Sequence, residues 1–151
     1  MGKTIFDDIV SGEMKAWTVW ENDDFMAFLT PFPNTPGFTV VIPKVNLSDY
    51  LFDMKEDDYT ALLLASKKVA RKLEIAFDTP RVAMIVEGTG VAHVHIKLLP
   101  LIGDLAGKTD VWSQEKRFYP EYTGHITSHE GPKMADEELD KYQKMIREAV
   151  A

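Results

Sequence analysis

One long amphipathic segment constrains the fold more than any other feature of this sequence. Between about residues 55 and 74, apolar side chains recur at the spacing of an α-helix, at Tyr59, Leu62, Leu63, Val69, Ala70 and Leu73. A stripe of this kind packs one face of a helix against a core. The rest of the chain must therefore supply an apolar surface that covers the stripe.

Short segments on both sides of this helix are typical of β-strands. They are residues 17–20, 25–29, 38–42, 81–86 and 92–99. Turn residues at 22–24 predict a hairpin between the first two strands, and three prolines within residues 30–37 predict a loop. Residues 38–42 are apolar except for Thr39, as expected for a strand covered on both faces. The pattern predicts an α+β domain with an antiparallel sheet of about five strands and two main helices.

Both ends of the sequence carry helix signals. Thr4 precedes a short run with Asp7 and Asp8 in its first turn, which predicts a helix capped by Thr4 and ended by Gly12. A second helix is predicted near the C-terminus from the spacing of Leu139, Tyr142, Ile146 and Val150. Because no repeat or linker interrupts the chain, residues 1–151 are predicted to form one domain with a C-terminal tail helix.

The charge and composition exclude several classes of protein. The formal net charge of −7 argues against general binding to nucleic acid or to anionic membranes, which normally requires a basic face. Without cysteines the chain has neither a disulfide framework nor a thiolate metal site. The first ten residues lack the apolar region of a secretory signal, and no stretch has the length of a membrane span. We expect a cytoplasmic protein.

The residues best suited to a catalytic or binding site lie in the run from His93 to Lys97. In a strand, His93, His95 and Lys97 share one face, about 7 Å apart at each step, and we expect this face to be exposed. Val94 and Ile96, followed by Leu98, then belong to the core. A neutral imidazole is a nucleophile at neutral pH, and a nearby lysine favours the neutral ring and attracts phosphate oxygens.

Two other interpretations of this run remain open. A pair of histidines on the polar face of a strand is also found as ordinary solvated surface. A His-x-His pair also occurs in metal sites, but such a site usually needs a third histidine, cysteine or carboxylate ligand. Lys97 is a poor ligand, and His125 and His129 lie far along the sequence in a loop.

The whole sequence resembles the histidine triad (HIT) family, and in particular a bacterial-type subgroup. The family signature alternates three histidines with apolar residues, and residues 93–100 read His-Val-His-Ile-Lys-Leu-Leu-Pro. Residues 5–13, 25–29 and 36–44 are similar to the opening helix, hairpin and Pro-Gly…Ile-Pro-Lys run of the family. The end, residues 124–129 with 136–139, is similar to the tail of the subgroup. The order and spacing of these motifs make the resemblance specific.

This resemblance implies a fold, a partner and a reaction. In the family the middle histidine attacks the α-phosphorus of a nucleotide derivative and forms a nucleotidyl-histidine intermediate, which water hydrolyses. The corresponding residue is His95, with His93 supporting the site. The implied substrate is a nucleotide or dinucleotide with a phosphoanhydride or phosphoramidate linkage, and the implied assembly is a homodimer. Splitting one displacement into two easier ones is the general logic of covalent catalysis.

Lys97 stands where the family has its third histidine. Lysine stabilises negative charge but is a poor acid–base group at neutral pH. Relatives with a changed third position include nucleotidyltransferases and phosphorylases. The sequence therefore leaves open a hydrolase, a transferase or phosphorylase using the same covalent step, and a nucleotide-binding protein without turnover.

The positions that contact the nucleotide in the family are also changed. Thr30 stands where an aspartate often binds the ribose hydroxyls, and Thr89 replaces a glutamine that helps to hold phosphate. Gly88, Thr89 and Gly90 form a loop whose backbone N–H groups are expected to face an anion, although such a loop is equally typical of a tight turn. His129 is a candidate to complete the site, with an exposed loop histidine as the alternative.

Many bacterial relatives hold a structural zinc ion at four positions. In this sequence those positions are Thr4, Asp7, Asn46 and His93, so three of the four ligands have changed. We therefore expect a protein that folds without metal and uses no cofactor.

Overall fold

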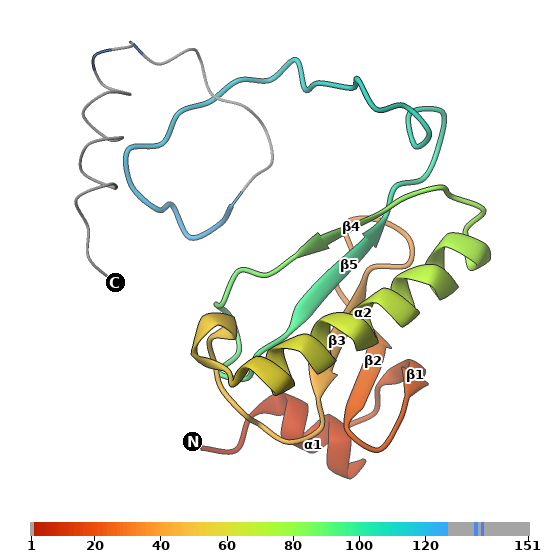
Figure 1. Ribbon diagram of the computed structural model, residues 1–151, viewed down its shortest axis with the longest axis vertical. Coiled ribbons are helices and arrows are strands. Elements are labelled where there is room, and N and C mark those ends of the chain that lie inside the picture. The colour runs from red at the N-terminus through yellow and green to blue at the C-terminus, as the bar shows by residue number, and fades with distance from the viewer. Residues whose placement is uncertain (1, 127–134, 136, 138–151) are drawn as a thin grey trace. The chain divides into compact units, whose positions relative to one another are not determined.

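The computed structural model describes residues 2–126, 135 and 137. It divides the chain into two compact units, Met1–Lys108 and Thr109–Ala151. The helices and strands described below lie in the first unit (Figure 1). Residues 109–126 of the second unit form bends and irregular backbone. The predicted C-terminal helix lies outside the described residues, and the single domain of residues 1–151 stays a prediction.

Five strands within residues 2–126 form one antiparallel sheet. They are β1 (Trp17–Glu21), β2 (Phe25–Leu29), β3 (Thr39–Pro43), β4 (Val82–Ile85) and β5 (Ile96–Pro100). Their spatial order is β1-β2-β3-β5-β4. A 3₁₀ turn, η1 (Leu51–Asp53), and the helix α2 (Glu56–Ala76) join β3 to β4. The last strand, β5, then lies between β3 and β4 in the sheet. This arrangement confirms the predicted α+β class and its five-stranded sheet.

The helix α2 runs along one face of the sheet (Figure 1). Its apolar stripe, Leu62, Ala65, Val69 and Leu73, is buried against Phe25, Ala27, Val41, Ile96 and Leu98 of β2, β3 and β5. Burying one such large aliphatic or aromatic side chain stabilises a fold by about 1.5–3 kcal/mol. The stripe therefore fixes the position of β5, which carries Lys97. None of the helices in the described residues is long and apolar enough to cross a bilayer.

The opposite face of the sheet is covered by the short helix α1 (Ile5–Ser11). Its Phe6 packs on a second cluster formed by Met26, Phe28, Val40 and Ile42. Successive residues of β2 and β3 therefore point alternately toward α2 and toward α1. Both faces of β3 are buried, as its largely apolar sequence predicted.

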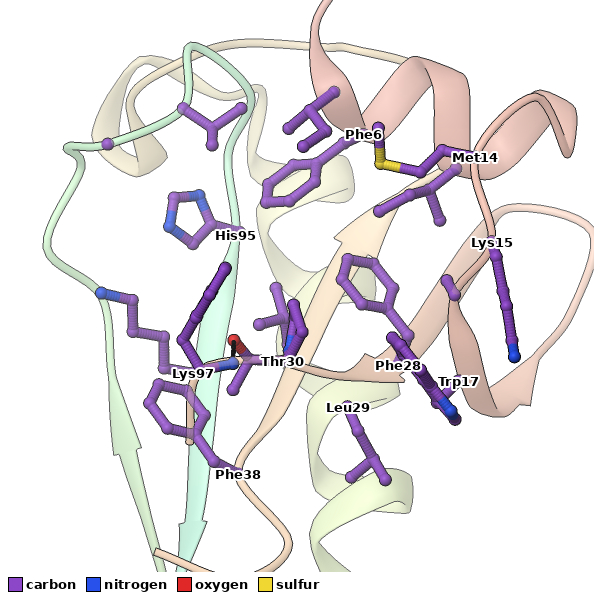
Figure 2. A pocket seen from close by; sticks show the side chains of 18 of the residues that line it. Phe6, Met14, Lys15, Trp17, Phe28, Leu29, Thr30, Phe38, His95 and Lys97 are labelled. Atoms are coloured by element: carbon purple, nitrogen blue, oxygen red, sulfur yellow. Dashed lines mark hydrogen bonds between the residues drawn. The ribbon is translucent and has the colours of Figure 1, made fainter. Parts of the chain in front are cut away.

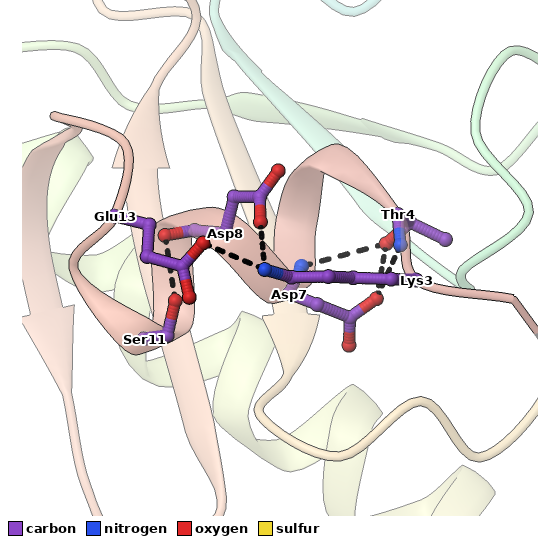
Figure 3. Close-up of polar contacts among 6 residues, drawn as sticks. All are labelled: Lys3, Thr4, Asp7, Asp8, Ser11 and Glu13. Carbon is purple, nitrogen blue, oxygen red and sulfur yellow. Dashed lines mark hydrogen bonds and ion pairs between the residues drawn. The ribbon is translucent and has the colours of Figure 1, made fainter.

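The first turn of α1 is held by the predicted cap. The Thr4 side chain accepts from the Asp7 N–H, while the Asp7 carboxylate accepts from the Thr4 N–H at 2.6 Å and from its hydroxyl at 2.7 Å (Figure 3). Gly12 ends the helix in the left-handed conformation, with φ +80°. Lys3 adds ion pairs to Asp8 and Glu13. Together these contacts fix the helix that carries Phe6.

The strand predicted over residues 92–99 is shorter than expected, because β5 begins only at Ile96. The register pairs Val41 with Ile96, so a continued ladder would place Pro43 opposite Val94. Proline has no N–H to donate, and the ladder ends there. The Val94 N–H donates instead to the Ser48 carbonyl at 2.7 Å. His93 and His95 therefore precede the regular strand.

Two glycines provide a test of how tightly the chain packs. Gly37 and Gly12 both have positive φ, +76° and +80°. A Cβ on Gly37 would lie 2.3 Å from the Phe77 ring, which packs on the core, whereas a Cβ on Gly12 meets nothing within 4 Å.

We expect Gly12→Ala to lower the free energy of unfolding by about 1–2 kcal/mol, the cost of a left-handed alanine. Gly37→Ala should lose about 1–3 kcal/mol more because the Phe77 ring must move. Urea unfolding of the two variants measures the difference. Equal losses would contradict the close packing at Gly37.

Candidate active site

A pocket of about 420 Å³ opens on the α1 side of the sheet. Its walls are largely apolar and include Phe6, Trp17, Phe28, Leu29 and Phe38. Its polar members include Lys15, Thr30, Thr89, His95 and Lys97. Figure 2 shows His95 and Lys97 along one side, with Phe28, Trp17 and Lys15 toward the other. A mostly apolar cavity with a few polar groups suits a flat ring that carries an anionic group.

His95 is held in a defined protonation state at this pocket. Its Nδ1 lies 2.8 Å from the His93 carbonyl oxygen, which can only accept, so Nδ1 carries the proton. In the neutral ring Nε2 then bears the lone pair. Burial lowers the pKa of His95 below 6.5, opposed by the hydrogen bond to His93, while Lys97 lowers the pKa and Glu87 raises it. The ring is therefore neutral at pH 7 and has a nucleophilic nitrogen.

His93 is completely buried and fixes the backbone behind His95. Its Nε2 donates to the Pro43 carbonyl at 2.8 Å, at the point where the ladder between β3 and β5 ends. Its Nδ1 has no hydrogen-bond partner among the described residues. Burial lowers the pKa of His93, opposed by the hydrogen bond to Pro43 and by the charge of Asp7. His93 thus supports His95 through its backbone carbonyl.

Phe6 joins α1 to both histidines. Its ring centroid lies 5.6 Å from that of His93 and 5.4 Å from that of His95, both in edge-to-face geometry. Sequence reasoning placed Phe6 in the opening helix but not in the site. The available signal was its apolar position in a short capped helix, which has to pack on some surface of the sheet.

The prediction of an exposed histidine face is wrong. His93 has no exposed surface and His95 is 7% exposed. The physical reason is the cover that Phe6 and the β3 end provide, both of which come from distant parts of the sequence. The other half of the prediction is confirmed, since Val94, Ile96 and Leu98 all belong to the core under α2.

Lys97 lines the pocket and forms an ion pair with Glu87. Both side chains are largely buried, with 25% and 19% of their surface exposed. Glu87 follows the end of β4, whose Ile85 is the register partner of Lys97. Sequence reasoning missed Glu87, because only the register of β4 on β5 brings it to Lys97.

The predicted nucleotide-contacting residues divide into three groups. Thr30, Thr89 and Gly90 line the pocket beside His95. The Thr30 hydroxyl oxygen accepts from the Phe32 N–H at 3.2 Å (Figure 2). Gly88 is absent from the lining and instead lies against the Tyr50 ring. His129 lies outside the described residues.

The four positions that hold zinc in bacterial relatives do not fit zinc in this chain. Thr4 and Asp7 bind each other in the helix cap, and the Asn46 amide donates to the Ala92 carbonyl at 2.9 Å. Only His93 offers an imidazole. Within the described residues, no group of three or more histidine, aspartate or glutamate side chains is arranged to hold a metal ion. Folding without metal stays a prediction.

Comparison with known proteins identifies the family. The model of the HIT domain matches residues 11–102, which is more than half of the chain. An uncharacterised HIT-like protein of Saccharolobus solfataricus is 29% identical over 116 residues, covering 74% of this chain and 76% of that protein. The chain therefore belongs to the HIT family.

Solved structures show the same fold. A HIT family member from Bacillus subtilis superposes with a TM-score of 0.68 at 23% identity, covering 99% of both chains. A HIT family hydrolase from Legionella pneumophila superposes with a TM-score of 0.58 at 25% identity, covering 67% of this chain and 95% of that one.

Burial of the two histidines predicts a stability that depends on pH. Because their folded-state pKa values lie below 6.5, the unfolded chain binds protons more readily than the folded one. Stability should therefore be fully present above pH 6.5 and decline as the pH falls below it. Asp7, whose pKa is lowered by the N–H and hydroxyl of Thr4, contributes a separate loss only below 3.8.

The measurement is urea unfolding between pH 8 and pH 5. We expect the free energy of unfolding to fall below pH 6.5 by up to about 1.4 kcal/mol per pH unit for each histidine. His95→Gln should remove part of this slope. A stability that stays constant from pH 8 to pH 5 would contradict the neutral, buried state of both rings.

Proposed function

We propose that this protein is a nucleotide-binding HIT hydrolase that cleaves a nucleoside α-phosphate linkage through a nucleotidyl-histidine intermediate on His95. The observation that carries the proposal is the fixed tautomer of His95. Its Nδ1–H donates to the His93 carbonyl, its ring is neutral, and Nε2 holds the lone pair beside a pocket that Lys97 also lines. A phosphoanhydride or a phosphoramidate is the proposed linkage.

The reaction consists of two displacements at one phosphorus. The Nε2 lone pair of His95 forms a bond to the α-phosphorus, and the bond to the leaving group breaks with its electron pair, which takes up a proton. The imidazole then carries positive charge, so the Nδ1–H bond to the His93 carbonyl becomes stronger. Water attacks the same phosphorus and loses a proton, the N–P bond breaks, and neutral His95 and a nucleoside monophosphate result.

The pocket supports a nucleoside as the group on the phosphorus. Phe6, Phe28 and Trp17 present aromatic surface suited to a flat base. In this proposal the polar parts of such a ligand are contacted by Thr30, Thr89 and Gly90. His129 remains a candidate contact. The name of the Legionella relative, a HIT family hydrolase, also supports hydrolysis.

A transferase or phosphorylase is the second candidate. Lys97, held by Glu87, supports this alternative because a lysine in an ion pair does not readily accept a proton from an attacking water molecule. In that reaction phosphate or another acceptor discharges the same His95 intermediate. A homodimer, a cytoplasmic location and the absence of a cofactor also remain proposals.

We expect His95→Ala to abolish turnover while keeping most of the nucleotide affinity. The test mixes protein with an adenosine phosphoramidate, quenches it in base, and maps the adduct by mass spectrometry. His125→Ala is the matched control, because this histidine is exposed in the second unit. An adduct on His93, or full turnover by His95→Ala, would refute the assignment. Binding without turnover in the native protein would favour a non-catalytic role.

Lys97→Ala should retain partial activity. If Lys97 is one of several groups that stabilise charge on phosphate oxygens, its loss costs about 10²–10³-fold in turnover. Single-turnover rates of Lys97→Ala and the native protein measure this ratio. A rate equal to that of the native protein would remove Lys97 from the reaction.

A further inference from the structure

The ion pair between Lys97 and Glu87 differs from the other ion pairs described in residues 2–126. It is the only one of them in which both side chains are less than 30% exposed. The pair of Arg71 and Glu74, for example, has an arginine that is 67% exposed. Removal from water strengthens the interaction between two charges, so Glu87 acts strongly on the Lys97 ammonium.

The two members of the pair have different access to the pocket. Lys97 is part of the pocket lining, whereas Glu87 is not. An anion that enters the pocket therefore lies beside a lysine whose ammonium already has a carboxylate partner. The anion and the carboxylate compete for the same ammonium. The stronger the ion pair with Glu87, the weaker is the remaining attraction between the ammonium and the anion.

We propose that Glu87 is a positioning residue that sets the affinity of the pocket for a phosphate group by acting through Lys97. The proposal rests on the proposed function for the nature of the ligand, a nucleoside monophosphate. Glu87 fixes the position of the Lys97 ammonium and offsets part of its charge. The pocket then binds the anionic product more weakly than a lone lysine would allow.

A catalyst benefits from this arrangement. Attraction that is equal in the bound state and in the transition state lowers KM or slows product release without raising kcat. A carboxylate behind the lysine reduces such uniform attraction. Fixing the ammonium also lowers the cost of orienting it when charge redistributes on the phosphate oxygens.

The test is a double-mutant cycle on binding of adenosine monophosphate. Calorimetric dissociation constants at low salt are compared for the native protein, Glu87→Gln, Lys97→Met and the double variant. We expect Glu87→Gln to tighten binding on the order of tenfold and Lys97→Met to weaken it. In the Lys97→Met background, Glu87→Gln should change the affinity by less than about twofold, because the ammonium through which Glu87 acts is absent.

Glu74→Gln is the matched control. It removes the same charge by the same substitution from the exposed pair with Arg71, and it should leave the affinity unchanged. Glu87→Asp keeps the charge on a shorter side chain and should give an affinity between those of the native protein and Glu87→Gln. It also provides the measurement if Glu87→Gln does not fold, as judged by circular dichroism.

Three results would overturn the inference. One is an affinity that neither Glu87 variant changes, another is an equal change with and without Lys97, and the third is no binding of adenosine monophosphate by the native protein. The adduct experiment on His95 is separate. An adduct on His95 with a cycle that shows no coupling would overturn the role of Glu87 alone, and coupling without an adduct would overturn the covalent reaction alone.

Discussion

The hydrogen bond from His93 to the Pro43 carbonyl is the contact on which the site depends. Proline ends the ladder between β3 and β5, and its carbonyl accepts from the His93 ring at 2.8 Å. The backbone of His93 is thereby placed so that its own carbonyl accepts from Nδ1 of His95 at 2.8 Å. Neither carbonyl can donate, so the first hydrogen bond fixes the tautomer of His93 and the second fixes that of His95.

The parts of the fold that follow from local rules were predictable from the sequence. Thr4, Asp7 and Gly12 define α1 through capping chemistry that acts within a few residues. The apolar stripe of α2 and the strands β2 and β3 follow from periodicity. Family resemblance placed His95 and Lys97 at one pocket, where the structure also brings them together.

The remainder depended on contacts between distant residues. Periodicity alone extended β5 back through His95, because it does not consider that Pro43 lies across the register. Burial of the histidines depends on Phe6, which is nearly ninety residues away in the sequence. Glu87 reaches Lys97 only through the pairing of β4 with β5. These features are set by tertiary register, which the spacing of residues along the chain does not encode.

Phe6 connects the packing of the two histidines with the wall of the pocket. One edge-to-face ring contacts both imidazoles and at the same time forms part of the apolar wall. A change of side chain at this position alters the room available to a ligand and also the packing that holds His95. Under the proposed function, a change of base preference that arises through α1 would therefore also change the reaction rate, and the two properties would evolve together.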